Sequence, residues 1–157
     1  MKQPRGFTLI ELAVVVAIIG ILASIAVPLG EVAAKRSREQ DLRRALREIR
    51  TGIDAYKSAV EQGRIARRAD GSGYPPHLED LVIGVEDARS PKQAKIYFLR
   101  HLPRDPMYGD TSVPPAATWG KRSYASPPDA PQEGEDVFDV YSLAESKGIN
   151  GVPYRDW

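Results

Sequence analysis

A carboxylate stands inside the most apolar stretch of the chain. Residues 7–29 are almost entirely aliphatic, yet Glu11 lies near the beginning of this run. An ionised side chain within a membrane helix is costly unless it finds a partner, so such a residue is by default a functional one. The position of Glu11 therefore needs an explanation, and its chemistry is that of an anion that requires a cation.

A cation for Glu11 can come from the residues just before it. The first six residues, MKQPRG, form a short charged leader that ends in Gly6. If this leader is removed after Gly6, the α-amino group of Phe7 lies about one helical turn from Glu11. Glu11 can then pair with its own amine or with that of a neighbouring subunit. In the second case the pair drives assembly, because an unpaired carboxylate in lipid is the costly alternative.

No other residues have the spacing of a catalytic centre. The chain has no cysteine, which excludes disulfides, thiolate metal sites and cysteine catalysis. His77 and His101 are isolated from each other, and the sequence has no phosphate-binding loop, nucleophile elbow or metal-binding histidine pair. Asp105 precedes Pro106 and is expected to shape a turn. We therefore expect that the protein is not an enzyme.

The apolar run is long enough to cross a bilayer. At 1.5 Å per residue, a helix over 7–29 measures about 34 Å, against a hydrocarbon core of about 30 Å. Lys2 and Arg5 precede it, which favours a cytoplasmic N-terminus. A cleaved signal peptide is a weaker interpretation, because its apolar core spans only about 7–15 residues. A plain membrane anchor gives no role to Glu11.

Residues 30–62 are predicted to continue this helix as an amphipathic stem. Apolar residues recur at intervals of three or four positions: Leu42, Leu46, Ile49, Ile53, Tyr56 and Val60. Charged residues occupy the other faces, with Glu39 and Arg43 in the favourable i, i+4 order. Gly63 is the first strong stop signal, so we expect the helix to end at about Gln62.

The stem is basic, whereas the rest of the chain is acidic. From 31 to 68 there are eleven Lys and Arg against six Asp and Glu; from 69 to 157 there are nine against fourteen. Four arginines of the stem could suggest nucleic-acid binding: Arg43, Arg44, Arg47 and Arg50. Stacking aromatic residues do not accompany them, so we expect no nucleic-acid partner. A basic stem that meets the acidic head of another subunit is the sharper hypothesis.

Residues 63–157 are predicted to form a loop-rich head, since eleven of the thirteen prolines lie there. The stretch YPPHLEDLVIG predicts a turn and a short helix with Leu78, Leu81 and Val82 inward. The stretches WGKRSYASPP and DVFDVYSLAE alternate as strands do, and DAPQEGE connects them.

The predicted fold class is therefore α+β. A long N-terminal helix has its lower half embedded in the membrane, and a small C-terminal antiparallel sheet packs on its upper half. The expected segments are a leader (1–6), a transmembrane helix (7–29), to which the resemblance described next adds the role of filament core, a stem helix (30–62) and a head (63–157).

The N-terminal segment RGFTLIELAVVVAIIGILASIAVP resembles that of type IV pilins and of type II secretion pseudopilins. The resemblance implies that a prepilin peptidase cuts after Gly6 and methylates Phe7, and that Glu11 is the assembly residue. It also implies that the helix between Gly20 and Pro28 unwinds when the subunit leaves the membrane. This is physically reasonable, because proline costs a regular helix about 3 kcal/mol and glycine about 1 kcal/mol.

The head resembles the major pseudopilin of type II secretion in four features: YPPHLEDL, YFLRHLPRDP, DVFDVYSL and the final Trp157. Pseudopilins of this kind typically hold a calcium ion in the loop after the last strand, and Ca²⁺ needs six to eight oxygen ligands. This chain departs from the pattern, since Val152 and Pro153 stand where the family usually has aspartates.

The remaining candidates for a calcium site are few. They are the carbonyl of Leu143 and the side chains of Glu145 and Asp156, and their spacing is not a recognised metal signature. The alternative is a glycine turn held by the packing of Tyr154 and Trp157. We favour this alternative and expect no cofactor.

These features together predict a structural subunit of a periplasmic type II secretion filament that helps to export folded proteins. The implied partners are further copies of the chain in a helical homopolymer, other pseudopilins, a prepilin peptidase, an inner-membrane platform protein and an assembly ATPase. The precursor is expected to span the bacterial inner membrane once, with its N-terminus cytoplasmic and its head in the periplasm. Two alternatives stay open: a type IV pilus subunit for adhesion, motility or DNA uptake, and an anchored periplasmic binding module that does not polymerise.

Overall fold

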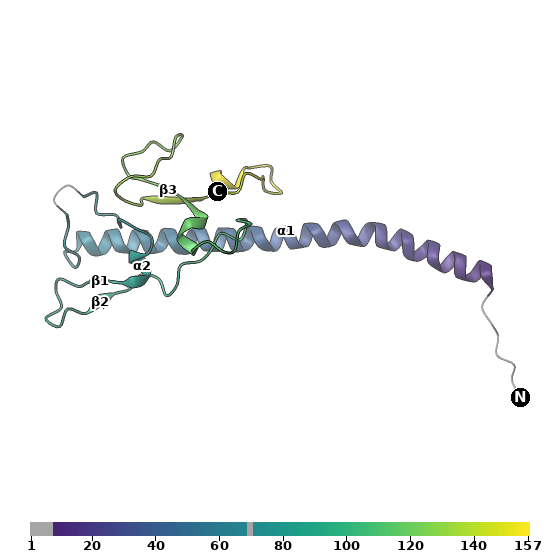
Figure 1. Cartoon of the computed structure of the whole chain (residues 1–157), viewed down its shortest axis with the longest axis horizontal. Coiled ribbons are helices and arrows are strands. Elements are labelled where there is room, and N and C mark those ends of the chain that lie inside the picture. Colours follow the sequence, from purple (N-terminus) through teal and green to yellow (C-terminus); the bar gives the residue numbers. More distant parts are fainter. Residues whose placement is uncertain (1–7, 69–70) are drawn as a thin grey trace, which may run out of the picture. The chain divides into compact units, whose positions relative to one another are not determined.

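The structure, a computed structural model, describes residues 8–68 and 71–157, and residues 25–28 by their backbone alone. The chain divides into two compact units, residues 1–37 and 38–157. The predicted α+β class is confirmed (Figure 1). In chain order, the elements are α1 (Leu9–Glu61), α2 (Asp80–Ile83), β1 (Val85–Glu86), β2 (Lys95–Ile96), the 3-10 helix η1 (Pro115–Thr118), β3 (Trp119–Arg122), β4 (Asp139–Ser142) and the 3-10 helix η2 (Tyr154–Asp156).

The N-terminal part of α1 exposes its aliphatic side chains. The large ones between Leu9 and Leu22 are all exposed, and α1 is the one helix of the described residues that is long and apolar enough to cross a bilayer. The helix is continuous through Gly20 and Pro28. The predicted unwinding of this stretch concerns the assembled filament and stays a prediction.

The C-terminal end of α1 is closed by a Schellman motif. Gly63 has a φ of +68°, a left-handed conformation that glycine adopts without steric cost. Its N–H donates to the carbonyl of Val60, and the N–H of Arg64 donates to the carbonyl of Ala59. The predicted stop at about Gln62 is thus confirmed, with the last helical residue at Glu61.

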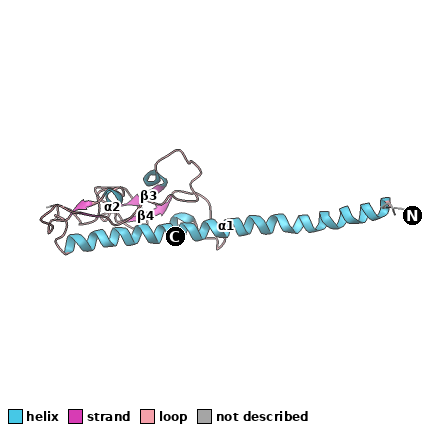
Figure 2. Cartoon of the chain, turned by 90° about the horizontal axis from the view of Figure 1, so that it is seen from below, coloured by secondary structure: helices cyan, strands magenta, loops and turns pink. Residues whose placement is uncertain are grey.

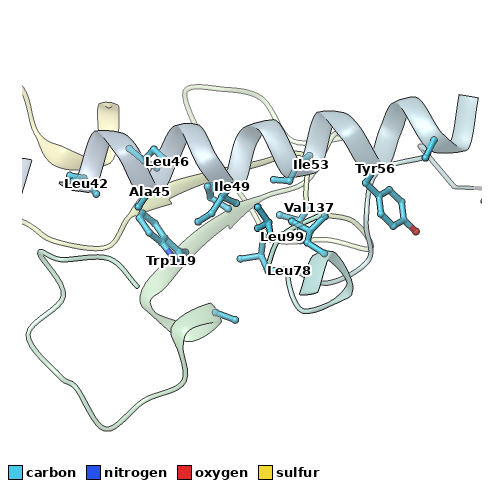
Figure 3. Packing of buried hydrophobic residues seen from close by; sticks show 14 of the residues in the cluster. Leu42, Ala45, Leu46, Ile49, Ile53, Tyr56, Leu78, Leu99, Trp119 and Val137 are labelled. Carbon is cyan, nitrogen blue, oxygen red and sulfur yellow. The ribbon is translucent and has the colours of Figure 1, made fainter. Parts of the chain in front are cut away.

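The predicted apolar stripe of the stem forms the core of the 38–157 unit. All six of its residues are buried, and they face side chains from several parts of the head, among them Leu78, Leu99, Trp119 and Val137 (Figure 3). Leu78 and Leu81 are fully buried and Val82 packs against the core, as the sequence predicted. A helix of this length needs such a stripe because most helical stability in proteins comes from packing.

The strands form two separate antiparallel pairs rather than the single sheet expected. β1 pairs with β2, and β3 pairs with β4 in the register Trp119 to Ser142 and Arg122 to Asp139. Figure 2 shows β3 and β4 side by side along α1. Four prolines lie between β2 and β3, and proline cannot donate to a ladder. The segment that would join the two pairs is therefore irregular.

A buried aspartate holds this irregular segment to β4. Asp105 accepts hydrogen bonds from the hydroxyl of Ser142 at 2.6 Å and from the N–H of Met107 at 2.7 Å. Burial raises the pKa of Asp105, and the bonds from Ser142, Met107 and Leu143 oppose this effect. The predicted role of Asp105 in a turn is confirmed, and the same side chain also joins the turn to a strand.

Shortening a buried residue of the stripe should destabilise the head. Ile49 has no exposed surface, so Ile49→Ala should lower the free energy of unfolding by about 2–5 kcal/mol through lost burial and a cavity. Arg47→Ala, an exposed substitution two residues away, should change it by about 0.5 kcal/mol or less. Denaturant unfolding of the full chain in detergent, followed by tryptophan fluorescence, measures both. Equal effects of the two substitutions would contradict this account of the core.

Candidate functional site

The first described residues form a capping box around Glu11. The N–H and hydroxyl of Thr8 both donate to Oε2 of Glu11 at 3.4 Å, and the N–H of Glu11 donates to the Thr8 hydroxyl at 3.3 Å. The carbonyl of Thr8 accepts the first helical bond, from the N–H of Leu12 at 3.1 Å. Thr8 is thus the N-cap of α1, and Glu11 is the third helical residue.

This cap is a role of Glu11 that the sequence analysis missed, although its signal was present. The spacing of Thr8 and Glu11 is the S/T-x-x-E pattern of a capping box. A carboxylate near a helix N-terminus is also stabilised by the helix dipole. A carboxylate offers about four acceptor positions on two oxygens, so the cap leaves Glu11 able to accept a cation as well. Gly6 and Phe7, the predicted processing residues, lie outside the described residues.

A second glutamate of α1 is buried against the C-terminal segment, by which we mean residues 143–157. Glu39 is only 8% exposed. Its Oε1 accepts a hydrogen bond from the N–H of Ile149 at 2.7 Å and one from the hydroxyl of Tyr154 at 3.0 Å. The predicted exposed pair of Glu39 with Arg43 is therefore wrong, because tertiary contacts give both side chains other partners.

Two arginines of the stem hold the same segment. The guanidinium of Arg43 lies 4.3 Å from the ring centroid of Trp157, a cation–π contact. Arg50 donates from Nε to Asp139 at 2.8 Å, and from Nη2 to the main-chain oxygens of Val140 and Trp157 at 3.1 and 2.9 Å. Positions 39, 43 and 50 share one helix face, since eleven residues make about three turns.

Most of the four stem arginines that could suggest nucleic-acid binding have partners within the protein. Besides Arg43 and Arg50, Arg44 pairs with Asp41 at 3.3 Å. Three of the four arginines that could suggest nucleic-acid binding therefore have partners within the protein. Arg43 and Arg50 contact the head, whereas the pair of Arg44 with Asp41 lies within the helix.

The weak calcium candidates do not form a site. Leu143, Glu145 and Asp156 are all exposed, and Asp156 lies 4.0 Å from the guanidinium of Arg155. Within residues 8–68 and 71–157, three or more acidic or histidine side chains nowhere come close enough to hold a metal ion. Ca²⁺ takes six to eight oxygen ligands, and the three candidate residues do not supply such a set, so they do not fit calcium.

The chain is similar to one family model at its N-terminus and to two known proteins over nearly its whole length. Residues 1–27 match the model of the prokaryotic N-terminal methylation motif. The type II secretion system core protein G of Klebsiella michiganensis is 32% identical over 162 residues, covering 99% of this chain and 90% of that protein. The protein of the same name from Dickeya chrysanthemi is 27% identical, covering 96% of each chain.

The similarity to pilus proteins covers less than half of the chain. A fimbrial protein of Pseudomonas aeruginosa is 45% identical over 64 residues, which is 41% of this chain and 40% of that protein. No solved structure matches the chain with significance. The similarity that extends over the whole chain is thus to secretion proteins.

Alkaline pH should weaken the contact between Glu39 and Tyr154. Burial and the bond to Glu39 raise the pKa of Tyr154 from 10.0 to about 12. Below about pH 10 the folded and unfolded chains both keep this proton. Between about pH 10 and 12 only the unfolded chain releases it, so stability falls as the pH rises.

The test compares unfolding free energies at about pH 8 and pH 11. Tyr154→Phe should be less stable than the wild type at pH 8, because it lacks the bond to Glu39, but should lose less stability by pH 11. Tyr97→Phe, at an exposed tyrosine, is the control and should keep the wild-type slope. Identical pH slopes for the wild type and Tyr154→Phe would refute the prediction.

Proposed function

The chain belongs to the family of type II secretion system core protein G, whose members are pilin-like pseudopilins, and we propose that it is a subunit of a periplasmic filament that helps to export folded proteins. The family has a structural role and is not enzymatic. The observation that carries the proposal is the N-terminal part of α1, where exposed aliphatic side chains surround a single carboxylate. Such a surface needs lipid or neighbouring subunits around it.

The proposed precursor is processed before assembly. A prepilin peptidase removes residues 1–6 after Gly6 and methylates the amine of Phe7, while residues 7–29 lie in the bacterial inner membrane. Two observations support this: the methylation motif matches over 1–27, and α1 begins just after Phe7, at Leu9. Cleavage converts an internal peptide N–H into a cationic amine, about one helical turn from Glu11.

The proposed assembly step pairs this amine with Glu11 of a neighbouring subunit. In the unassembled subunit, Glu11 caps its own helix through Thr8. Pairing with a neighbouring Phe7 amine removes a poorly compensated charge from lipid, so it favours the filament over the free subunit. The stretch from Gly20 to Pro28 unwinds in the filament, which lets the subunit lengthen as it leaves the membrane.

The proposed topology places the head on the periplasmic side. The N-terminus of the precursor is cytoplasmic, because Lys2 and Arg5 precede the apolar run. The stem (30–62) then leaves the membrane and carries the head (63–157) into the periplasm. Filament growth needs a platform protein in the inner membrane, an ATPase and other pseudopilins. The long similarity to secretion proteins favours this filament over a pilus, because the similarity to a fimbrial protein covers only 41% of this chain.

Intact mass spectrometry of the protein from its native membrane should show processing. We expect the mass of residues 7–157 plus one methyl group. A strain that lacks the prepilin peptidase is the control and should yield the full-length precursor. Full-length protein in a strain that has the peptidase would contradict the proposal, and would favour an anchored binding module that does not polymerise.

Glu11→Gln should prevent filament formation without affecting cleavage. The neutral amide cannot form the charged pair with the Phe7 amine, so we expect at least a tenfold loss of sedimentable filaments, with the processed mass unchanged. Glu31→Gln, at an exposed position of the same helix, is the matched control and should assemble normally. Exoprotein secretion should fall with filament yield, whereas loss of long surface fibres with normal secretion would indicate a pilus subunit.

Thr8→Ala separates capping from pairing. It removes the hydroxyl of the capping box and keeps the carboxylate, and the loss of such a cap costs about 0.5–2 kcal/mol of helix stability. We therefore expect Thr8→Ala to assemble better than Glu11→Gln. Glutamine can also close a capping box, so Glu11→Gln loses the charge and keeps the cap. Normal assembly of Glu11→Gln beside defective assembly of Thr8→Ala would mean that Glu11 acts only as a cap, which would overturn the proposed pair.

A further inference from the structure

The C-terminal segment must be held in place by something other than a disulfide or a large core of its own. Residues 143–152 are mostly exposed and include two glycines, Gly148 and Gly151. Ordering a flexible segment costs about 1–2 kcal/mol of backbone entropy per residue. The chain has no cysteine, so the cost must be offset by a metal ion or by contacts within the protein.

The segment is closed on itself by main-chain hydrogen bonds. The N–H of Gly148 donates to the carbonyl of Val152 at 2.9 Å, and the N–H of Gly151 donates to the carbonyl of Gly148 at 2.9 Å. The N–H of Tyr154 donates to the carbonyl of Ser146 at 3.2 Å. These bonds form a compact turn, but none of them ties the turn to the rest of the head.

Glu39 ties the turn to α1 at two points. Its Oε1 accepts from the N–H of Ile149, inside the turn, and from the hydroxyl of Tyr154, just after it. Tyr154 is 2% exposed and its ring packs edge-on against Trp157, with centroids 5.0 Å apart. A hydrogen bond to a charged acceptor is about twice as strong as a neutral one, and more so when the pair is buried.

The final residue is held from the same helix face. Arg43 stacks on the ring of Trp157, and Arg50 binds its main-chain oxygen. The Trp157 ring also occupies the space where a side chain at Gly148 would lie, so the turn and the final residue pack directly against each other. The three charged side chains of α1 thus fix both the turn and the end of the segment.

In these contacts the segment donates hydrogen bonds to an anion, whereas in a calcium site it would offer oxygen atoms to a cation. A calcium ion is surrounded by carbonyl and carboxylate oxygens, whereas this turn presents hydrogen-bond donors, an N–H and an O–H, to a carboxylate. Val152 and Pro153 have no side-chain oxygen to offer, and Glu145 and Asp156 are exposed. The segment is organised around an anion that belongs to the protein.

We propose that Glu39, assisted by Arg43 and Arg50, does the anchoring that a bound metal ion would otherwise do, so that the head folds and stays folded without calcium. This anchor is independent of the filament proposal, because it concerns the fold of a single subunit.

A chelator experiment on the full-length protein in detergent tests the first half of the proposal. We measure the melting temperature in excess EGTA and then in a calcium titration to millimolar concentration. We expect the melting temperature to stay within about 1 °C throughout. A decrease in EGTA that calcium reverses would overturn the proposal.

Substitution of Glu39 tests the second half. Glu39→Ala should lower the melting temperature by about 5–10 °C, because it leaves the N–H of Ile149 and the hydroxyl of Tyr154 without their acceptor. Glu39→Gln keeps one acceptor oxygen and should show a smaller decrease. Glu31→Ala, at an exposed glutamate of the same helix, should leave the melting temperature unchanged.

Hydrogen exchange localises the effect and does not depend on global stability alone. In Glu39→Gln, which should fold, the amide of Ile149 and its neighbours in the segment should exchange at least tenfold faster, while amides of β3 should not change. Unchanged exchange of the segment would overturn the proposal even if the melting temperature fell. All three measurements use unassembled protein, so their outcome is distinct from any failure in filament formation or secretion.

Discussion

The head depends on the packing of one helical stripe. Along α1, residues from Leu42 to Val60 recur at intervals of three and four, and the short elements of the head bury their apolar side chains against them. The strands are only two or four residues long, and paired strands of this size are not stable alone in water. The helix therefore supplies the surface on which the rest of the head becomes ordered.

Polar contacts from the same helix fix the position of the C-terminal end of the head. Glu39, Arg43 and Arg50 follow one face of α1 and bind β4 and the C-terminal segment. In the sequence these residues look like the ordinary charged positions of an amphipathic helix, and only the structure shows their contacts. Burial strengthens the contacts of Glu39, which is 8% exposed, because in a low-dielectric environment an unpaired donor or charge is expensive. The helix thus combines an apolar stripe, which packs against the head, with charged groups, which fix the position of β4 and of the C-terminal segment.

The N-terminal part of α1 obeys a different constraint. Its side chains are as apolar as those of the core, but they are exposed, so their partners must lie outside the chain. Glu11 fits this constraint in two ways: it caps the helix in the single subunit, and a cation from a neighbour would neutralise it on assembly. A carboxylate that is only partly satisfied within its own chain is suited to an assembly reaction.

The sequence by itself determined the long helix, its stripe, its stop at Gly63, the two strands of the β3–β4 pair and the membership of a pilin-like family. These features depend on local periodicity, on glycine chemistry and on a short motif, all of which are written in neighbouring residues. Tertiary structure alone decided the fate of Glu39, which local spacing assigned to Arg43, and the division of the strands into two separate pairs. Both outcomes depend on groups more than a hundred residues apart or on which segments pack together. No local pattern encodes such contacts, because burial becomes known only once the chain has folded.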